Sequence, residues 1–175
     1  MPGDSGRMEE GSRMSVPSQA QFSGASGEYY VAAVLAYKRL HVGMVRQGGQ
    51  SVDLLVSTAD GSRSTTIQVK SRGKAHKKRK DGVIVGYDWF IGKKVFDQDP
   101  ALLYVLVDLK EWAECTPDVF PMRAGDLVEH FKRLMDARPE KDWENDAFIF
   151  QPKPEQIECY RNNWFPLWED LNGHL

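Results

Sequence analysis

The sequence is poor in cysteine and has no long apolar run, and both shortages narrow the class of protein. Its two cysteines, Cys115 and Cys159, lie far apart and show no CxxC spacing. Free thiols are therefore expected at both positions, rather than a disulfide or a metal site. No apolar run approaches the roughly 18–20 residues that cross a bilayer, so no membrane partner is expected.

The N-terminal segment lacks the apolar stretch of a secretory signal, and a cytoplasmic location is expected. Residues 1–17 are rich in Gly, Ser, Pro and charge. This composition favours a disordered tail, because it offers few apolar groups to bury. Over all 175 residues, 41% are hydrophobic and 27% are charged. These fractions are ordinary for a globular protein, so residues 18–175 are predicted to form a single domain.

Charge is distributed unevenly, although the formal net charge is only −2. Residues 1–92 contain 13 Lys and Arg against 8 Asp and Glu, whereas residues 93–175 contain 10 against 17. This asymmetry predicts a basic face opposite an acidic one. A local basic field can steer a polyanion whatever the net charge.

Hydrophobic periodicity and turn residues predict a mixed order of helices and strands. A helix is expected from Ser18, which forms a capping box with Gln21, to about Leu40. Asp60-Gly61 is a hairpin signal, and Pro121 restricts its strand to a sheet edge. The predicted strands cover residues 41–45, 51–58, 63–71, 101–109, 119–122 and 146–150; a helix covers 124–137, a helical segment begins at 154, a loop covers 72–81, and 86–96 contain a short helix or turn. The order predicts an α/β protein without the strict alternation of a doubly wound nucleotide-binding fold.

Alternation along the two hairpin strands brings three polar side chains to one sheet face. In VDLLV, Asp53 points away from its apolar neighbours, and in TIQVK, Gln68 and Lys70 point away from Ile67 and Val69. An antiparallel hairpin therefore brings Asp53 close to Gln68 and Lys70. Asp is depleted in strand interiors, which favours a functional role for Asp53 over a structural one.

This grouping suits a hard divalent cation, because Mg²⁺ prefers oxygen ligands and keeps several waters. Asp53 supplies a charged ligand, Gln68 a neutral oxygen, and the carbonyl of Val69 a further oxygen. Glu28 adds a second carboxylate if its helix packs on the hairpin. The metal would polarise a phosphate and acidify a bound water. Lys70 would position that water and stabilise the charge that builds on phosphorus.

The segments GEYYVAAVLAYKRL, SVDLLVST and STTIQVKS resemble the PD-(D/E)xK nuclease superfamily. In that pattern a helix Glu precedes a strand Asp, and the partner strand carries (D/E)xK. The resemblance covers residues 20–109: Glu28 matches the helix acid, Asp53 the motif aspartate, and Gln68 with Lys70 the final pair. It implies a restriction-endonuclease-like core, with a central mixed β-sheet flanked by helices.

The resemblance also implies an activity and its partners. The expected reaction is Mg²⁺- or Mn²⁺-dependent hydrolysis of phosphodiester bonds in DNA. Glu28, Asp53, Gln68 and Lys70 are the implied catalytic residues, and no small-molecule cofactor is expected. Related nucleases often act as symmetric pairs, so a homodimer is a further expectation.

Two positions depart from the motif. Val52 replaces its proline, which is a mild change, and Gln68 replaces its second acid. Gln68 removes one negative charge and is expected to weaken metal binding. An alternative function is therefore a catalytically weak or inactive nuclease-fold module that binds nucleic acid. A third is a protein-interaction domain that uses the acidic C-terminal half and its tryptophans.

A basic run follows the predicted catalytic strand and is the candidate contact for DNA phosphates. Such a run is often only a solvated loop, but its position favours phosphate binding, with an affinity that falls steeply with salt. His76, within the run, is expected at the surface. The basic residues are Arg72, Lys74, Lys77, Lys78, Arg79 and Lys80.

Two groups of aromatic residues complete the pattern. Tyr87, Trp89 and Phe90 follow the basic run and are expected to pack on the core, with base stacking as the alternative. Trp164 and Trp168 are expected in the core or at an interface.

Overall fold

A five-stranded sheet forms the centre of the computed structural model, which describes residues 18–45, 52–112, 115–136 and 148–172. The strand order is β1-β2-β3-β7-β8. The strands are β1 (His41–Met44), β2 (Leu54–Ser57), β3 (Ser64–Arg72), β7 (Leu103–Asp108) and β8 (Asp118–Arg123). The β3–β7 pair is parallel and the other three pairs are antiparallel, so the sheet is mixed.

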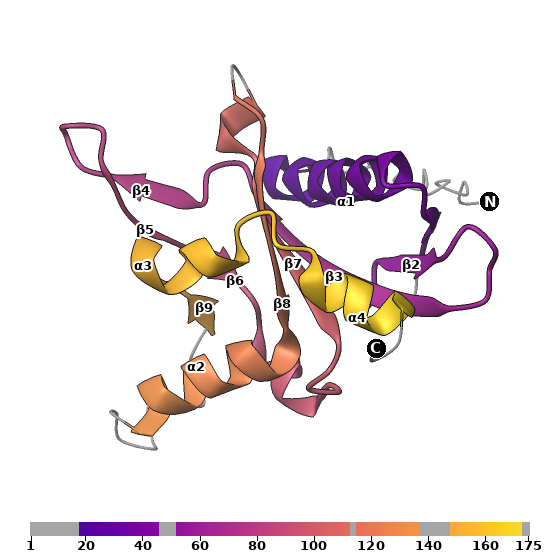
Figure 1. The fold of residues 1–175 in the computed structure, drawn as a ribbon. Coiled ribbons are helices and arrows are strands. Elements are labelled where there is room, and N and C mark those ends of the chain that lie inside the picture. The colour runs from indigo at the N-terminus through magenta and orange to yellow at the C-terminus, as the bar shows by residue number, and fades with distance from the viewer. Residues whose placement is uncertain (1–17, 46–51, 113–114, 137–147, 173–175) are drawn as a thin grey trace, which may run out of the picture.

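Helices flank this sheet, as Figure 1 shows. They are α1 (Gln19–Tyr37), α2 (Ala124–Asp136) and α4 (Phe165–Asn172). The predicted fold class, a central mixed sheet flanked by helices, is confirmed. The predicted C-terminal helical segment is divided into α3 (Pro154–Ile157), η4 (Glu158–Tyr160) and α4. The tail predicted over residues 1–17 lies outside the described residues.

Helix α1 begins where the capping box predicts. The Gln21 side chain accepts a hydrogen bond from the Ser18 backbone N–H at 2.7 Å, and the Ser18 hydroxyl accepts one from the Gln21 N–H at 3.4 Å. The Gln21 N–H also donates to the Ser18 carbonyl at 3.0 Å, and the two side-chain bonds together form the reciprocal capping box that opens the helix. The helix ends at Tyr37 rather than near Leu40, since Arg39 takes a left-handed conformation with φ 65°.

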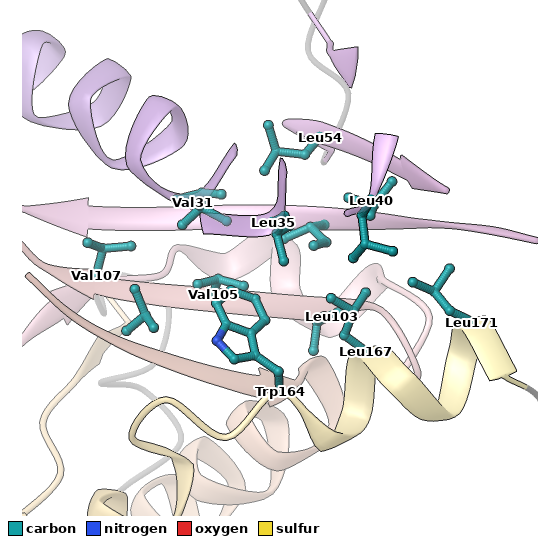
Figure 2. Packing of buried hydrophobic residues seen from close by; sticks show 14 of the residues in the cluster. Val31, Leu35, Leu40, Leu54, Leu103, Val105, Val107, Trp164, Leu167 and Leu171 are labelled. Carbon is teal, nitrogen blue, oxygen red and sulfur yellow. The ribbon is translucent and has the colours of Figure 1, made fainter. Parts of the chain in front are cut away.

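One apolar layer lies between the sheet and helices α1 and α4 (Figure 2). Val31 and Leu35 supply the inward stripe of α1, and Trp164 precedes α4 in the same layer, as predicted for the core. The residues of β7 alternate, so that every second side chain enters this layer. The layer includes Val31, Leu35, Leu54, Leu103, Val105, Val107, Trp164, Leu167 and Leu171.

A second apolar layer, rich in aromatic rings, covers the opposite face. Tyr104 and Leu106 of β7 point into it and meet α2 and a short ribbon made of β6 (Trp89–Phe90) and β9 (Ile149–Phe150). All residues of β7 are buried, so this strand is covered on both faces, as its continuous apolar run requires. Strand β8 lies at the sheet edge, as its Pro121 predicts.

The loop predicted over residues 72–81 is wrong in part. Strand β3 continues to Arg72, and β4 (His76–Lys78) pairs with β5 (Ile84–Tyr87) in a hairpin that projects from the sheet (Figure 1). Its turn uses Gly82 at φ 85°. The Asp81 carboxylate accepts a bond from the Val83 N–H at 3.1 Å. Lysines on an exposed ribbon show no apolar alternation, so periodicity did not reveal it.

The segment predicted to contain one short helix or turn, 86–96, is more varied. It completes β5, forms β6 and enters the 3₁₀ turn η1 (Lys93–Asp97). A second 3₁₀ turn, η2 (Lys110–Trp112), follows β7. Cys115 and Cys159 are free and exposed. Within the described residues, no helix has both the length and the apolar character that a membrane span requires.

Two glycines of α1 differ in what surrounds them, and this difference generates a stability prediction. A Cβ added to Gly27 would lie 2.2 Å from Ser71 Cβ, whereas one added to Gly24 would meet nothing within 4 Å. We expect Gly27→Ala to lower the free energy of unfolding by about 1–3 kcal/mol through overpacking. Gly24→Ala should raise it by up to about 1 kcal/mol through helix propensity. Urea denaturation measures both, and equal shifts would contradict the close approach of α1 to β3.

Candidate active site

Strand β3 extends beyond its neighbour β2 and leaves part of one edge open. Pairing with β2 stops at Leu54–Ile67, and the last ladder bond runs from the Asp53 N–H to the Ile67 carbonyl at 2.9 Å. Beyond this point, β7 pairs with one side of β3 through Arg72. In the part of the chain that the structure describes, no strand pairs with the other side.

The carboxylate of Asp53 occupies the start of this open edge. Its Oδ2 accepts hydrogen bonds from the Val69 N–H at 2.7 Å and from the Gln68 side-chain amide. The Asp53 carboxylate therefore accepts the hydrogen bond that a backbone carbonyl would accept if the neighbouring strand continued. The N–H and C=O of one residue point to the same side of a strand, so the carbonyl of Val69 also faces the open edge.

Close packing of α1 on β3 brings Glu28 to the same place. Gly27 lies directly against Ser71, and the Ser71 hydroxyl donates to the Ser23 carbonyl at 2.7 Å. Glu28 follows Gly27 and is half-buried. A glycine inside a helix lowers helix propensity, but Gly27 also sets how near the acid comes to the strand.

These side chains line one cleft of about 540 Å³. Helix α1 forms one wall, β3 forms the floor with Asp53, and the β6–β9 ribbon forms the other wall. All four residues predicted as catalytic border the cleft, together with Val69. The complete lining is Ala20, Gly24, Glu28, Asp53, Gln68, Val69, Lys70, Ser71, Arg72, Trp89, Phe90 and Ile149.

Burial is the main influence on the charge of Asp53. Removal from water raises the pKa of its carboxyl group, while the Val69 N–H and the positive charge of Lys70 act in the opposite direction. A raised pKa in a cleft, beside a specific charge partner, is typical of functional sites. Gln68 is only 6% exposed, so its side chain is not part of an exposed polar strand face.

The donor set suits a hard cation that keeps part of its water shell. Among the described residues, no three His, Cys, Asp or Glu side chains gather as a ligand group. The cleft instead combines two carboxylates, one amide side chain and one backbone carbonyl. Mg²⁺ is commonly held by one or two carboxylates, with waters at other positions, so these residues fit it.

Tyr104 lies beside the site and was not identified from the sequence. It is the register partner of Gln68 across the parallel β3–β7 pair, and its hydroxyl donates to the Gln98 side chain. Burial raises the pKa of Tyr104 to about 12, and the nearby charge of Asp53 adds to the rise. The phenol therefore stays protonated at neutral pH. Because Tyr104 lies within the apolar run 101–109, the sequence pattern does not distinguish it from residues that only pack in the core.

The six basic residues predicted to bind nucleic acid do not lie together in the cleft. Of these, only Arg72 lines it, and both Arg72 and Lys77 form ion pairs with Asp88. Lys74 pairs with Glu111 at 3.5 Å, and Arg79 pairs with Asp81 at 3.2 Å. Lys78 and Lys80 form no ion pair with a described residue and border a shallow hollow at the hairpin tip.

The predicted surface position of His76 is wrong. Its ring is 8% exposed, and Nδ1 lies 2.6 Å from Oδ2 of Asp108. The same carboxylate accepts bonds from the backbone N–H groups of Ala75, His76 and Lys110, at 3.0, 3.2 and 3.1 Å. Asp108, at the end of β7, thus holds the base of the β4–β5 hairpin through hydrogen bonds. The sequence feature that could have indicated this role is Asp108 itself, an acid at the end of an apolar run.

The aromatic residues after the hairpin divide into two kinds. Tyr87 and Trp89 are buried and stack with ring centroids 5.4 Å apart, as predicted for packing residues. Phe90 is 64% exposed, so the packing prediction is wrong for this ring. Trp164 is buried, and Trp168 packs on the same layer.

Comparisons with known proteins agree with this architecture. No protein-family profile and no curated protein matches the sequence. Among solved structures, the chain is similar to a bacterial homing endonuclease, I-Ssp6803I, at 13% identity and a TM-score of 0.55. The similarity covers 86% of this chain and 92% of the homing endonuclease. It shows that the two chains share a fold, and the predicted nuclease-like core is confirmed at that level.

The raised pKa of Asp53 generates a prediction about stability and pH. A folded-state pKa above the unfolded value favours the protonated form, so stability is lost as pH rises through it. Asp53→Asn keeps an acceptor for the Val69 N–H and removes this loss. Without divalent metal, we expect the variant and the wild type to differ least below the unfolded pKa of Asp, about 3.9. The advantage of the variant should then grow with pH and level off above the folded pKa.

Chemical denaturation between pH 3 and pH 8 measures this difference. Asp60→Asn is the matched control, because the pKa of Asp60 is lowered to about 2 by hydrogen bonds from Thr58 and Ser62. Its removal should not reproduce the rising advantage. A constant difference across the range for Asp53→Asn would contradict the raised pKa.

Proposed function

We propose that this chain is a Mg²⁺- or Mn²⁺-dependent endonuclease that hydrolyses phosphodiester bonds of DNA through a PD-(D/E)xK-like site. The proposal depends on one observation: Glu28, Asp53, Gln68 and Lys70 border a single cleft at the open edge of β3. The similarity in fold to a protein named as a homing endonuclease supports it.

Four groups would hold the cation. Glu28 and Asp53 contribute negative charge, and the Gln68 side chain and the Val69 carbonyl contribute neutral oxygens. When bound, a Mg²⁺ or Mn²⁺ ion supplies positive charge that polarises the scissile phosphate and acidifies a water. The hydrogen bonds on Oδ2 of Asp53 fix the orientation of that carboxylate, which prepares the cleft before a ligand enters.

Lys70 would act on the substrate rather than hold the cation. Its ammonium group interacts with the charge of Asp53 and borders the same cleft. From this position Lys70 orients the attacking water and stabilises negative charge on the phosphate in the transition state. Gln68 lacks the charge of an acid, so the cation is held with less electrostatic attraction than two strand acids would give.

The projecting hairpin would bind the DNA backbone. Lys78 and Lys80 form no ion pair with a described residue and are exposed, so they are the members of the basic run best able to meet phosphates. Arg72, Lys74, Lys77 and Arg79 would need to exchange their carboxylate partners for phosphate. A homodimer, expected from the resemblance, stays a prediction.

A plasmid-nicking assay with Mg²⁺ and with Mn²⁺ tests the catalytic assignment. We expect Lys70→Ala to lower the nicking rate by about 10²–10³-fold, the usual effect of removing one group that stabilises transition-state charge. Lys132→Ala, which removes an exposed lysine on α2, should nick like the wild type. Equal rates for the wild type and Lys70→Ala would reject the site.

Metal binding can be read separately from cleavage in the same variants. Mg²⁺ should raise the melting temperature of the wild type and of Lys70→Ala, but not that of Asp53→Asn, because only the last removes a charged ligand. Binding of DNA without any cleavage or metal effect would favour the alternative, an inactive module that binds nucleic acid.

Salt dependence tests the role of the hairpin. For duplex DNA, the slope of log affinity against log salt falls by about 0.9 for every phosphate that a lysine no longer neutralises. The double variant Lys78→Ala/Lys80→Ala should therefore bind more weakly and show a slope smaller by up to about 2. Lys38→Ala/Lys132→Ala removes the same charge away from the hairpin. Indistinguishable slopes for these two variants would exclude a specific role for the tip.

A further inference from the structure

The β6–β9 ribbon gives the cleft a wall that differs from its floor. The floor carries Asp53, Gln68 and Lys70, all polar, whereas the wall presents Trp89, Phe90 and Ile149. These wall residues come from two distant segments joined by antiparallel pairing, with Phe90 opposite Ile149. Directly opposed side chains on one sheet face lie in contact, so Phe90 and Ile149 form one apolar surface.

The ribbon is held firmly by the residue before Phe90. The Trp89 indole donates to the Val107 carbonyl at 2.9 Å and packs edge-on against Phe120 at 5.5 Å between centroids. Trp89 is 1% exposed. Because side chains alternate along a strand, burial of Trp89 turns Phe90 outward. The exposed ring therefore belongs to a rigid part of the fold.

The Phe90 ring also lies near a second backbone segment. A Cβ placed on Gly92 would meet the ring at 3.6 Å, so the ring lies beside the backbone there. Gly92 has φ 85°, a conformation that favours glycine. The ring is nevertheless 64% exposed, and Ile149 beside it is 38% exposed. Such a surface in a charged cleft suits a ligand that is itself flat and apolar.

We propose that Phe90 is a stacking platform for an unpaired base of the substrate strand, next to the phosphate held over Lys70. The inference depends on the proposed nuclease function and defines its substrate class as DNA with a single-stranded or splayed segment. A nucleotide is the occupant that combines a phosphate for Lys70 with a flat base for the ring. Bases inside a duplex have both faces covered by their neighbours, and aromatic side chains bind unstacked bases of any sequence.

Binding of a fluorescently labelled single strand and of a duplex of the same sequence tests this inference. Both are measured in Ca²⁺ at low salt, and gels check that the strands stay intact. Phe90→Ala and Phe90→Leu should weaken binding of the single strand by roughly 5- to 100-fold, the usual contribution of one stacked base. Phe90→Tyr should retain it, and the duplex should bind each variant alike.

A matched control is available in Phe165, which is 63% exposed on α4 and does not line the cleft. Phe165→Ala should bind both ligands like the wild type. Phe90→Leu keeps an apolar side chain without an aromatic face, so normal single-strand binding by this variant would overturn the stacking role. Equal losses on the single strand and the duplex would also overturn it.

The test separates this inference from the proposed function. If the wild type binds the single strand through Phe90 but shows no cleavage in Mg²⁺ or Mn²⁺, the platform stands and the nuclease proposal fails. If the wild type cleaves and Phe90→Leu cleaves and binds equally well, the nuclease proposal stands and the platform fails. If the wild type binds neither form of DNA, both are wrong.

Discussion

The difference in length between β2 and β3 is the constraint on which the site depends. A strand edge leaves backbone groups without partners, and proteins manage such edges in several ways. Here the carboxylate of Asp53, the residue just before β2, satisfies the Val69 N–H beyond the last β2–β3 pair. The same replacement leaves the Val69 carbonyl facing the cleft and puts an acid beside Lys70. Asp53 thus lies both at the last hydrogen bond between the two strands and at the first position of the polar floor of the cleft.

This arrangement has a cost in stability that the proposed function would explain. The charged form of a carboxylate is less stable when the group is partly withdrawn from water, and the pKa of Asp53 is raised for this reason. Apolar residues at this position would stabilise the sheet more simply. Local conflict with stability is expected where a site must bind charge. The hydrogen bonds from Gln68 and Val69 offset part of the cost without neutralising the acid.

Much of the fold could be predicted, because the signals were local. The capping box at Ser18, the Asp60-Gly61 turn and the apolar run of β7 act within a few residues. The hairpin strand pattern likewise indicated that Asp53 and Gln68 share one face. The predictions for His76 and Phe90 were wrong because residues far away in the sequence determine where these two side chains lie. Asp108 buries His76 from 32 residues away, and the outward turn of Phe90 follows from contacts of Trp89 with β7 and β8.

The antiparallel pairing of β6 with β9 has a consequence for how the protein acquires its cleft during synthesis. Glu28, Asp53, Gln68 and Lys70 all leave the ribosome before Ile149, and Phe90 meets its partner only when Ile149 has been made. Contacts between distant segments form late, because a long loop must close first. A nascent chain would therefore hold the charged floor before it holds the apolar wall, and the cleft would be complete only after Ile149 has been made and has paired with Phe90.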